Sequence, residues 1–290
     1  MRSKNSTGGT DASAPLPAPA KKSDLGTRVL SAVVLAPPVL GAVWLGGWAF
    51  QAVLALAGAI CTVEWVRMVV PAEHRRAATL GFLVVVLGPL AVAVLTGDTR
   101  LGVLLGVVFM GSTVIRLRSA GARDPWLGAA GVPYLAVGLV ALNWVRTGNG
   151  EDGLALFLFL LLGVWATDIG AYFAGKGIGG PKLMPSVSPK KTWAGLIGGM
   201  AAAAAVGYGV AAWFGAAMPW VAAAAGPIVA VVAQAGDLFE SHAKRRGDVK
   251  DSGRLIPGHG GLLDRIDGLL SAAAGFALFH ALAGESLAWW

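Results

Sequence analysis

Four aspartates lie within or at the edge of long apolar segments in the second half of this 290-residue chain. Asp168 lies inside one such segment, Asp237 lies near the end of another, and Asp264 and Asp267 open the last one. A carboxylate at membrane depth costs about 2.5–3.5 kcal/mol on insertion scales, so such residues are usually paired, line a cavity or are functional. These four residues are therefore the first candidates for chemistry.

The spacing of the polar residues predicts that they meet. Three pairs stand three or four positions apart and so share a helix face: Asp168 with Tyr172, Asp237 with Ser241, and Asp264 with Asp267. Hard cations such as Mg²⁺ take oxygen ligands, typically one or two carboxylates together with substrate phosphate. The alternative is that each aspartate only forms an ion pair with a neighbouring Lys244, Arg245 or Arg265. Three clusters on one side of the chain favour a metal site.

The cytoplasmic loop expected at 175–192 is rich in groups that bind phosphate. It ends in Ser188, Lys190, Lys191 and Thr192, just ahead of the next apolar segment. Hydroxyl and ammonium donors, together with the free N–H groups of a helix start, suit an anionic ligand. The residue order of a Walker A loop is missing. A basic loop before a membrane helix also arises simply as a determinant of topology.

A second loop, expected at 240–262, combines positive charge with turn residues. Three cations suit anionic ligands: Lys244, Arg245 and Lys250. Gly260 and Gly261 allow the backbone to approach a ligand closely. His259 is either a structural residue of the turn or a titrating group, and the second role requires a partner.

The segment 241–267 resembles the signature of the phosphatidate cytidylyltransferases, also called CDP-diglyceride synthetases. That pattern runs Ser-x-x-Lys-Arg, four residues, Lys-Asp, then Pro-x-His-Gly-Gly, two residues, and Asp-Arg-x-Asp. Every fixed position matches: Ser241, Lys244, Arg245, Lys250, Asp251, His259, Gly260, Gly261, Asp264, Arg265 and Asp267. The upstream motifs around Asp168 and Ser188 are also similar to that family in order and spacing. The resemblance covers residues from about 160 to 283.

The resemblance implies an all-helical membrane enzyme of phospholipid biosynthesis that joins CTP and phosphatidate into CDP-diacylglycerol and releases pyrophosphate. It implies Mg²⁺ bound by Asp237 and Asp264, in a cavity that faces the cytoplasm and opens sideways to membrane lipids, and often a homodimer. Nucleic acid is not an expected partner. Two other functions stay open at this stage. One is a CTP-dependent polyprenol or lipid kinase, which transfers the γ-phosphoryl group, and the other is a cation-coupled transporter that uses the intramembrane carboxylates.

The residues expected to act divide into two groups. Those expected to be catalytic are Asp237, Asp264, Lys244, Arg245, Lys250 and Asp267. Those expected to bind substrate are Asp168, Tyr172, Ser188, Lys190, Lys191, Thr192, Ser241, Asp251, His259, Gly260, Gly261 and Arg265. Within the second group, Lys190, Lys191 and Thr192 are assigned to the β- and γ-phosphates of CTP.

The composition predicts a polytopic, all-α membrane protein. Hydrophobic residues make up 56% of the chain and charged residues only 13%, against roughly 25% charged residues in soluble domains. Apolar runs close to the roughly 20 residues that a bilayer requires predict nine spans: 27–45, 48–66, 77–96, 101–116, 126–145, 153–174, 193–214, 219–239 and 263–283. Three regions follow: a disordered cytoplasmic tail at 1–24, N-terminal spans at 25–150, and a catalytic membrane region at 151–290.

The basic residues predict the orientation. With the N-terminus in the cytoplasm, all 23 Lys and Arg residues except Arg100 and Arg146 fall on the inner side, which is the positive-inside pattern. The active site then faces the cytoplasm, in what we expect to be a bacterial inner membrane. The pair Trp289–Trp290 would lie at the outer interface. Glu64, near the inner end of its span, is expected to reach toward water or to pair with Arg67.

This topology predicts opposite accessibility for two loops. In a Cys61→Ser background, a cysteine at Asp98 should react with an impermeant reagent in intact cells, because that loop is expected outside. A cysteine at Lys250 should react only after the membrane is permeabilised. Labelling of both positions from the same side would refute the number of spans between them.

Overall fold

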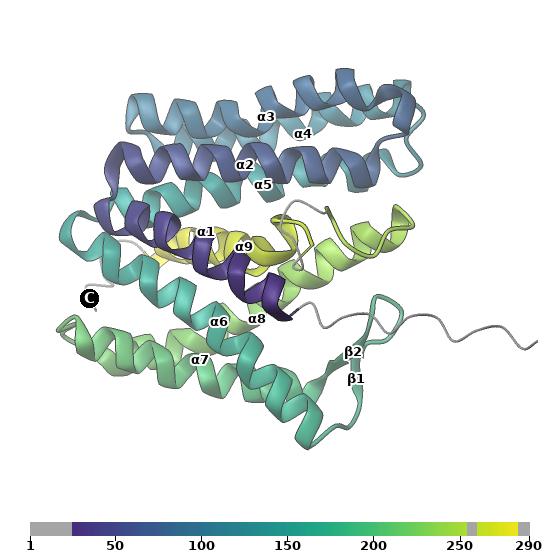
Figure 1. Ribbon diagram of the computed structural model, residues 1–290. Helices are drawn as coiled ribbons and strands as arrows, with labels where there is room; N and C mark the ends of the chain where they lie inside the picture. Colours follow the sequence, from purple (N-terminus) through teal and green to yellow (C-terminus); the bar gives the residue numbers. More distant parts are fainter. Residues whose placement is uncertain (1–24, 254–259, 284–290) are drawn as a thin grey trace, which may run out of the picture.

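The computed structural model describes the backbone of residues 25–253 and 260–283 and the side chains of residues 33–253 and 260–282. Within these residues the chain forms nine α-helices, two short 3₁₀ helices and one β-hairpin (Figure 1). The elements are α1 (Leu25–Leu45), α2 (Gly47–Val69), η1 (Ala72–His74), α3 (Arg75–Thr96), α4 (Thr99–Ser119), α5 (Pro125–Thr147), η2 (Gly150–Asp152), α6 (Gly153–Gly177), β1 (Lys182–Met184), β2 (Ser188–Thr192), α7 (Trp193–Trp213), α8 (Pro219–Arg246) and α9 (Leu263–Ala283).

The prediction of an all-α, polytopic membrane protein is confirmed. Each of the nine apolar runs corresponds to a helix, and the seven helices α2 to α8 are long and apolar enough to cross a membrane. The outward faces of these helices carry apolar side chains such as Leu56, Val84, Leu95 and Ile115, each more than 60% exposed. Contiguous apolar surface of this kind is rare on soluble proteins, and here it suits contact with lipid.

The helices form two groups joined by α9. In Figure 1, helices α2 to α5 lie together at the top and α6 to α8 at the bottom, with α1 and α9 between them. Helix α9 packs against α5 of the first group and against α8 and α6 of the second. The buried core is centred on α5, whose Val132, Leu135 and Leu139 are almost completely enclosed. The start of α9 therefore lies where both groups contribute side chains.

Small residues let the helices of the second group approach closely, as is common between membrane helices. At Gly198 on α7, an added Cβ would lie 2.3 Å from the Cβ of Ala174 on α6. At Gly236 on α8, it would lie 1.9 Å from the hydroxyl oxygen of Ser271 on α9. Gly236 directly precedes Asp237, so this close approach of α8 to α9 also brings their acidic residues together.

The basic loops gather at one end of the bundle. The described loops that follow α2, α4, α6 and α8 all lie at the right-hand end of Figure 1. This arrangement agrees with the expected distribution of Lys and Arg, while the side that faces the cytoplasm stays a prediction. The tail at 1–24, His259 and the pair Trp289–Trp290 lie outside the described residues.

The hairpin is an element that the sequence did not predict. Strands β1 and β2 pair antiparallel, with Lys182 opposite Thr192 and Met184 opposite Ser188. The N–H of Val187 donates to the carbonyl of Met184 across the turn, at 3.2 Å. The expected phosphate-binding loop is thus an ordered β-ribbon that leads directly into α7.

Candidate active site

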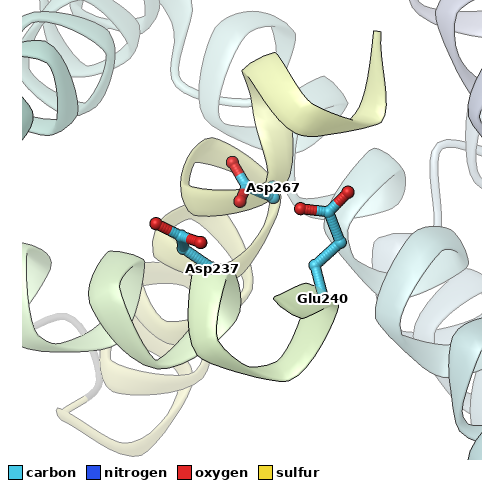
Figure 2. Close-up of side chains that lie close together, drawn as sticks. All are labelled: Asp237, Glu240 and Asp267. Atoms are coloured by element: carbon cyan, nitrogen blue, oxygen red, sulfur yellow. The ribbon is translucent and has the colours of Figure 1, made fainter. Parts of the chain in front are cut away.

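Three carboxylates converge where α8 meets α9. Asp237 and Glu240 stand one helical turn apart on α8, and Asp267 faces them from α9 (Figure 2). One oxygen of each lies within 4.8 Å of the others. We call Asp237, Glu240 and Asp267 the acidic cluster. The sequence predictions included both aspartates and missed Glu240, although its position three residues after Asp237 in the same helix was a usable signal.

Two lysines offset part of the negative charge of the acidic cluster. The ammonium of Lys191, at the end of β2, forms an ion pair with Asp237. Lys244 lies 2.9 Å from Oε2 of Glu240 and 2.8 Å from Oδ1 of Asp264. The other oxygen of Glu240, Oε1, is buried, and no donor among the described residues reaches it.

This arrangement fits a divalent cation. Carboxylate oxygens of three residues lie close together in a partly buried place, and Oε1 of Glu240 has no hydrogen-bond donor within the part of the chain that the structure describes. Such a group is costly to bury without a compensating charge. Carboxylate oxygens are the ligands that Mg²⁺ takes from proteins, usually one or two of them together with substrate phosphate, and the cluster offers three. The residues present are therefore a suitable ligand set.

Asp264 lies beside the acidic cluster and already has several partners. Besides Lys244, its carboxylate accepts hydrogen bonds from the backbone N–H of Ser252 at 3.1 Å and of Gly261 at 3.0 Å. The ion pair with Lys244 is the alternative that the sequence left open for this aspartate. Metal ligation by Asp264 stays a prediction, whereas Asp267 is the α9 residue that the structure brings into the cluster.

The residues of the expected phosphate-binding loop have different surroundings. Lys191 reaches the acidic cluster, Lys190 is exposed, and Ser188 is half-buried. The hydroxyl of Thr192 is buried and accepts a hydrogen bond from the N–H of Gly195 at 3.0 Å, which caps the start of α7. A Thr at this position stabilises a helix N-terminus by about 1 kcal/mol.

The two predicted residues of α6 lie at its exposed side. Asp168 is within electrostatic range of Asp237, Lys191 and Arg265, so it belongs to the same region of charge. Tyr172, one turn further, is exposed, and the ammonium of Lys176 lies 5.6 Å from the centre of its ring. The structure thus brings Asp168 near the acidic cluster, while Tyr172 contacts Phe173 and Lys176 of its own helix.

The remaining signature residues surround the end of α8 and the start of α9. The hydroxyl of Ser241 donates to Asp237 at 3.2 Å. The Nε of Arg245 approaches the carbonyl of Val187 in the hairpin turn at 3.5 Å, which links α8 to the ribbon. Gly260 adopts φ +90° beside Asp264. Four of these side chains are exposed: Arg245, Lys250, Asp251 and Arg265.

The expectation for Glu64 is wrong. This side chain does not reach water, since the residue is only 2% exposed. Its carboxylate accepts hydrogen bonds from the backbone N–H of Leu262 and Leu263, at 3.0 and 2.8 Å, rather than pairing with Arg67. These donors belong to the signature segment, so a residue of α2 contacts the site region directly.

A cluster of three aromatic side chains also joins the N-terminal helices to α8. Trp65 of α2 stacks on Phe239 of α8, with ring centres 5.7 Å apart. Tyr134 of α5 packs on both rings and donates its hydroxyl hydrogen to the backbone carbonyl of Asp267 at 3.2 Å. Phe239 lies between Asp237 and Glu240 in the sequence, so these rings hold the turn of α8 that carries the acidic cluster.

Comparisons with known proteins agree on one family. The model of the cytidylyltransferase family matches residues 26–283. A phosphatidate cytidylyltransferase of Brucella suis is 38% identical over 264 residues, which cover 91% of this chain and 96% of the relative. One of Pseudomonas aeruginosa is 36% identical over 89% of this chain and 97% of the relative. One of Haemophilus influenzae is 44% identical, over about half of each chain.

Proposed function

The chain belongs to the cytidylyltransferase family, and we propose that this nucleotidyltransferase joins CTP and phosphatidate into CDP-diacylglycerol, with release of pyrophosphate. The main support for the proposal is that residues of the signature converge with Asp237 and Lys191 on one site. Asp237, Lys244 and Asp267 come together with Lys191 of the hairpin, at the end of the bundle where the basic loops lie. Near full-length similarity to relatives that bear this enzyme name supports the same substrates.

The reaction brings two anions together, which explains the positive charge around the site. A phosphate oxygen of phosphatidate forms a bond to the α-phosphorus of CTP, and the bond from that phosphorus to the bridging β-phosphate oxygen breaks. Transfers of this kind depend mainly on positioning and on electrostatic stabilisation. Lys190 and Lys191 then bind the phosphates of CTP, and Lys244, Arg245, Lys250 and Arg265 serve the lipid phosphate. No general base is needed, because a phosphate monoester is largely ionised at neutral pH.

Asp237, Glu240 and Asp267 are the residues that would hold Mg²⁺, with Asp264 as the further ligand that the resemblance implies. When bound, Mg²⁺ supplies a Lewis acid that screens the repulsion between the substrates and stabilises charge on the pyrophosphate. Lys191 and Lys244 hold the carboxylates in place through their ion pairs. Ser241 does the same for Asp237 through its hydroxyl.

The location of the enzyme follows from the same proposal. CTP is a cytoplasmic nucleotide, so the site faces the cytoplasm in this proposal, and the positive-inside distribution of Lys and Arg supports an N-terminus on the same side. The bacterial relatives support a bacterial inner membrane. Phosphatidate reaches the site from the surrounding lipid, and exposed apolar side chains on α6 such as Ile169 and Phe173 offer a lipid-facing approach near Asp168. A homodimer remains part of this proposal.

Labelled nucleotide distinguishes cytidylyl transfer from a kinase. With purified protein, phosphatidate and Mg²⁺, label from the α-phosphate of CTP should enter the lipid fraction. Label from the γ-phosphate should leave as pyrophosphate. Label from the γ position in the lipid would instead identify a lipid kinase and overturn the proposal.

Substitutions in the acidic cluster test the metal site. Asp237→Asn and Asp267→Asn should each lower kcat by at least about 100-fold, because the site loses charge that it needs in the transition state. Asp264→Asn should be similarly inactive if this residue is also a ligand. Activity is measured per folded protein, with thermal melting followed in the same detergent.

The matched control is Asp248→Asn. Asp248 pairs with Arg123 on the exposed surface, and such pairs contribute roughly 0–1 kcal/mol, so this variant should remain close to wild type. Near-normal specific activity of Asp237→Asn and Asp267→Asn would end the assignment. Loss of activity strictly in proportion to loss of folded protein would show that the carboxylates are only structural.

A further inference from the structure

Glu64 is a buried carboxylate to which neither the signature nor the proposed chemistry gives a role. It lies on α2, far outside the signature segment 241–267, and it is 2% exposed. A buried charge of this kind is tolerated only when hydrogen bonds or opposite charges satisfy it. The hydrogen-bond partners of Glu64 therefore indicate its role.

The Glu64 carboxylate has three hydrogen-bond partners that the structure describes, and all of them lie between Ser252 and Leu263, the first residue of α9. Oε1 accepts from the N–H of Leu262 at 3.0 Å, and Oε2 accepts from the N–H of Leu263 at 2.8 Å and from the hydroxyl of Ser252 at 3.3 Å. The first N–H groups of a helix have no partner within it and carry a partial positive charge. Glu64 thus caps α9 from another helix.

Two glycines leave room for this carboxylate. A Cβ at Gly253 would lie 2.3 Å from Oε1 of Glu64, and a Cβ at Gly261 would lie 2.9 Å from the same atom and 2.0 Å from the hydroxyl of Ser252. The space beside Gly261 is therefore filled by the protein itself. The lack of a side chain at Gly261 allows close contact with Glu64 of α2.

The same segment holds Asp264 on its other side. The N–H groups of Ser252 and Gly261 donate to Asp264, and Asp264 in turn pairs with Lys244, which pairs with Glu240. A continuous series of contacts thus runs from Glu64 through the loop to the acidic cluster. If Glu64 no longer accepts these hydrogen bonds, the segment that carries the N–H donors to Asp264 is no longer held against α2.

We propose that Glu64 is a positioning residue for the active site: it fixes the segments around Ser252 and Leu262 against α2 and so sets the place of Asp264 and Lys244. The role in turnover rests on the proposed function, whereas the anchoring of the loop does not. Glu64→Gln is the suitable variant, because it preserves the size of the side chain. Whichever way the amide is oriented, its NH₂ group faces a backbone N–H and one acceptor is lost.

The primary readout is amide hydrogen exchange of the metal-free, substrate-free protein in lipid nanodiscs. In Glu64→Gln, peptides that contain Ser252 or Leu262 and Leu263 should exchange on the order of tenfold to a hundredfold faster, as expected for the loss of charge-assisted hydrogen bonds. Peptides from α5 should be unchanged. In the second readout, kcat for CTP and phosphatidate should fall at least about tenfold.

The matched control is Leu54→Ala, or the milder Leu54→Val if its melting temperature agrees better with that of Glu64→Gln. Leu54 is buried on the same helix, ten positions from Glu64 and therefore about 15 Å along the helix axis from the carboxylate that contacts the loop. At equal loss of melting temperature, the Leu54 variant should leave loop exchange near the wild-type rate. If it reproduces the loop exchange and the loss of kcat, or if Glu64→Gln leaves exchange unchanged, the proposal is wrong.

Ser252→Ala keeps the proposal testable if Glu64→Gln does not fold. It removes the longest of the three hydrogen bonds to Glu64 and leaves the backbone donors in place, so loop exchange should rise severalfold, roughly two- to tenfold. Unchanged amide hydrogen exchange around Leu262 in Ser252→Ala would count against the proposal that Glu64 holds this segment. Should the wild type fail to transfer cytidylyl groups, the proposed function falls, while the exchange result still decides the role of Glu64.

Discussion

The arrangement of this protein depends on holding several carboxylates close together at the end of a membrane bundle. Asp237, Glu240 and Asp267 approach within 4.8 Å of one another, although like charges at that distance repel strongly in a medium of low dielectric constant. Lys191 and Lys244 offset part of the repulsion through ion pairs, and a buried oxygen of Glu240 is left without a donor among the described residues. A bound cation would complete this balance, and the surrounding elements keep the carboxylates in position for it.

Packing between helices, rather than any single loop, provides that positioning. Gly236 lets α8 approach Ser271 of α9 closely, and Phe239 is held between Trp65 of α2 and Tyr134 of α5. Large-to-small or small-to-large changes at such tightly packed positions are poorly tolerated. The N-terminal helices therefore act as a rigid support for the site, and Glu64 extends that support to the segment before α9.

The helices could be predicted from the sequence because apolar runs of bilayer length are separated by charged and turn-forming residues. Lys244, Asp264 and Asp267 could be predicted because they are fixed positions of the signature, which spans 27 positions, 241–267. Asp237 could be predicted because a carboxylate near the end of an apolar segment is costly unless it is paired or functional. The role of Glu64 could not, since its partner Leu263 is 199 positions away and Arg67, three residues along the same helix, looked like the natural partner. Glu240 was hidden by Lys244 at i+4, which makes it look like half of a surface ion pair. The hairpin was missed because β2 contains a proline and two lysines, which are poor strand formers.

If the acidic cluster binds one divalent cation, metal binding should be measurable without turnover. Electron paramagnetic resonance of the substrate-free protein in nanodiscs, titrated with Mn²⁺ as a spectroscopic replacement for Mg²⁺, measures bound metal directly. We expect saturable Mn²⁺ binding that excess Mg²⁺ displaces and that Asp237→Asn and Asp267→Asn abolish, while Asp248→Asn binds Mn²⁺ as the wild type does. Absence of saturable binding to the wild type, or binding that survives in both cluster variants, would contradict the proposed metal site.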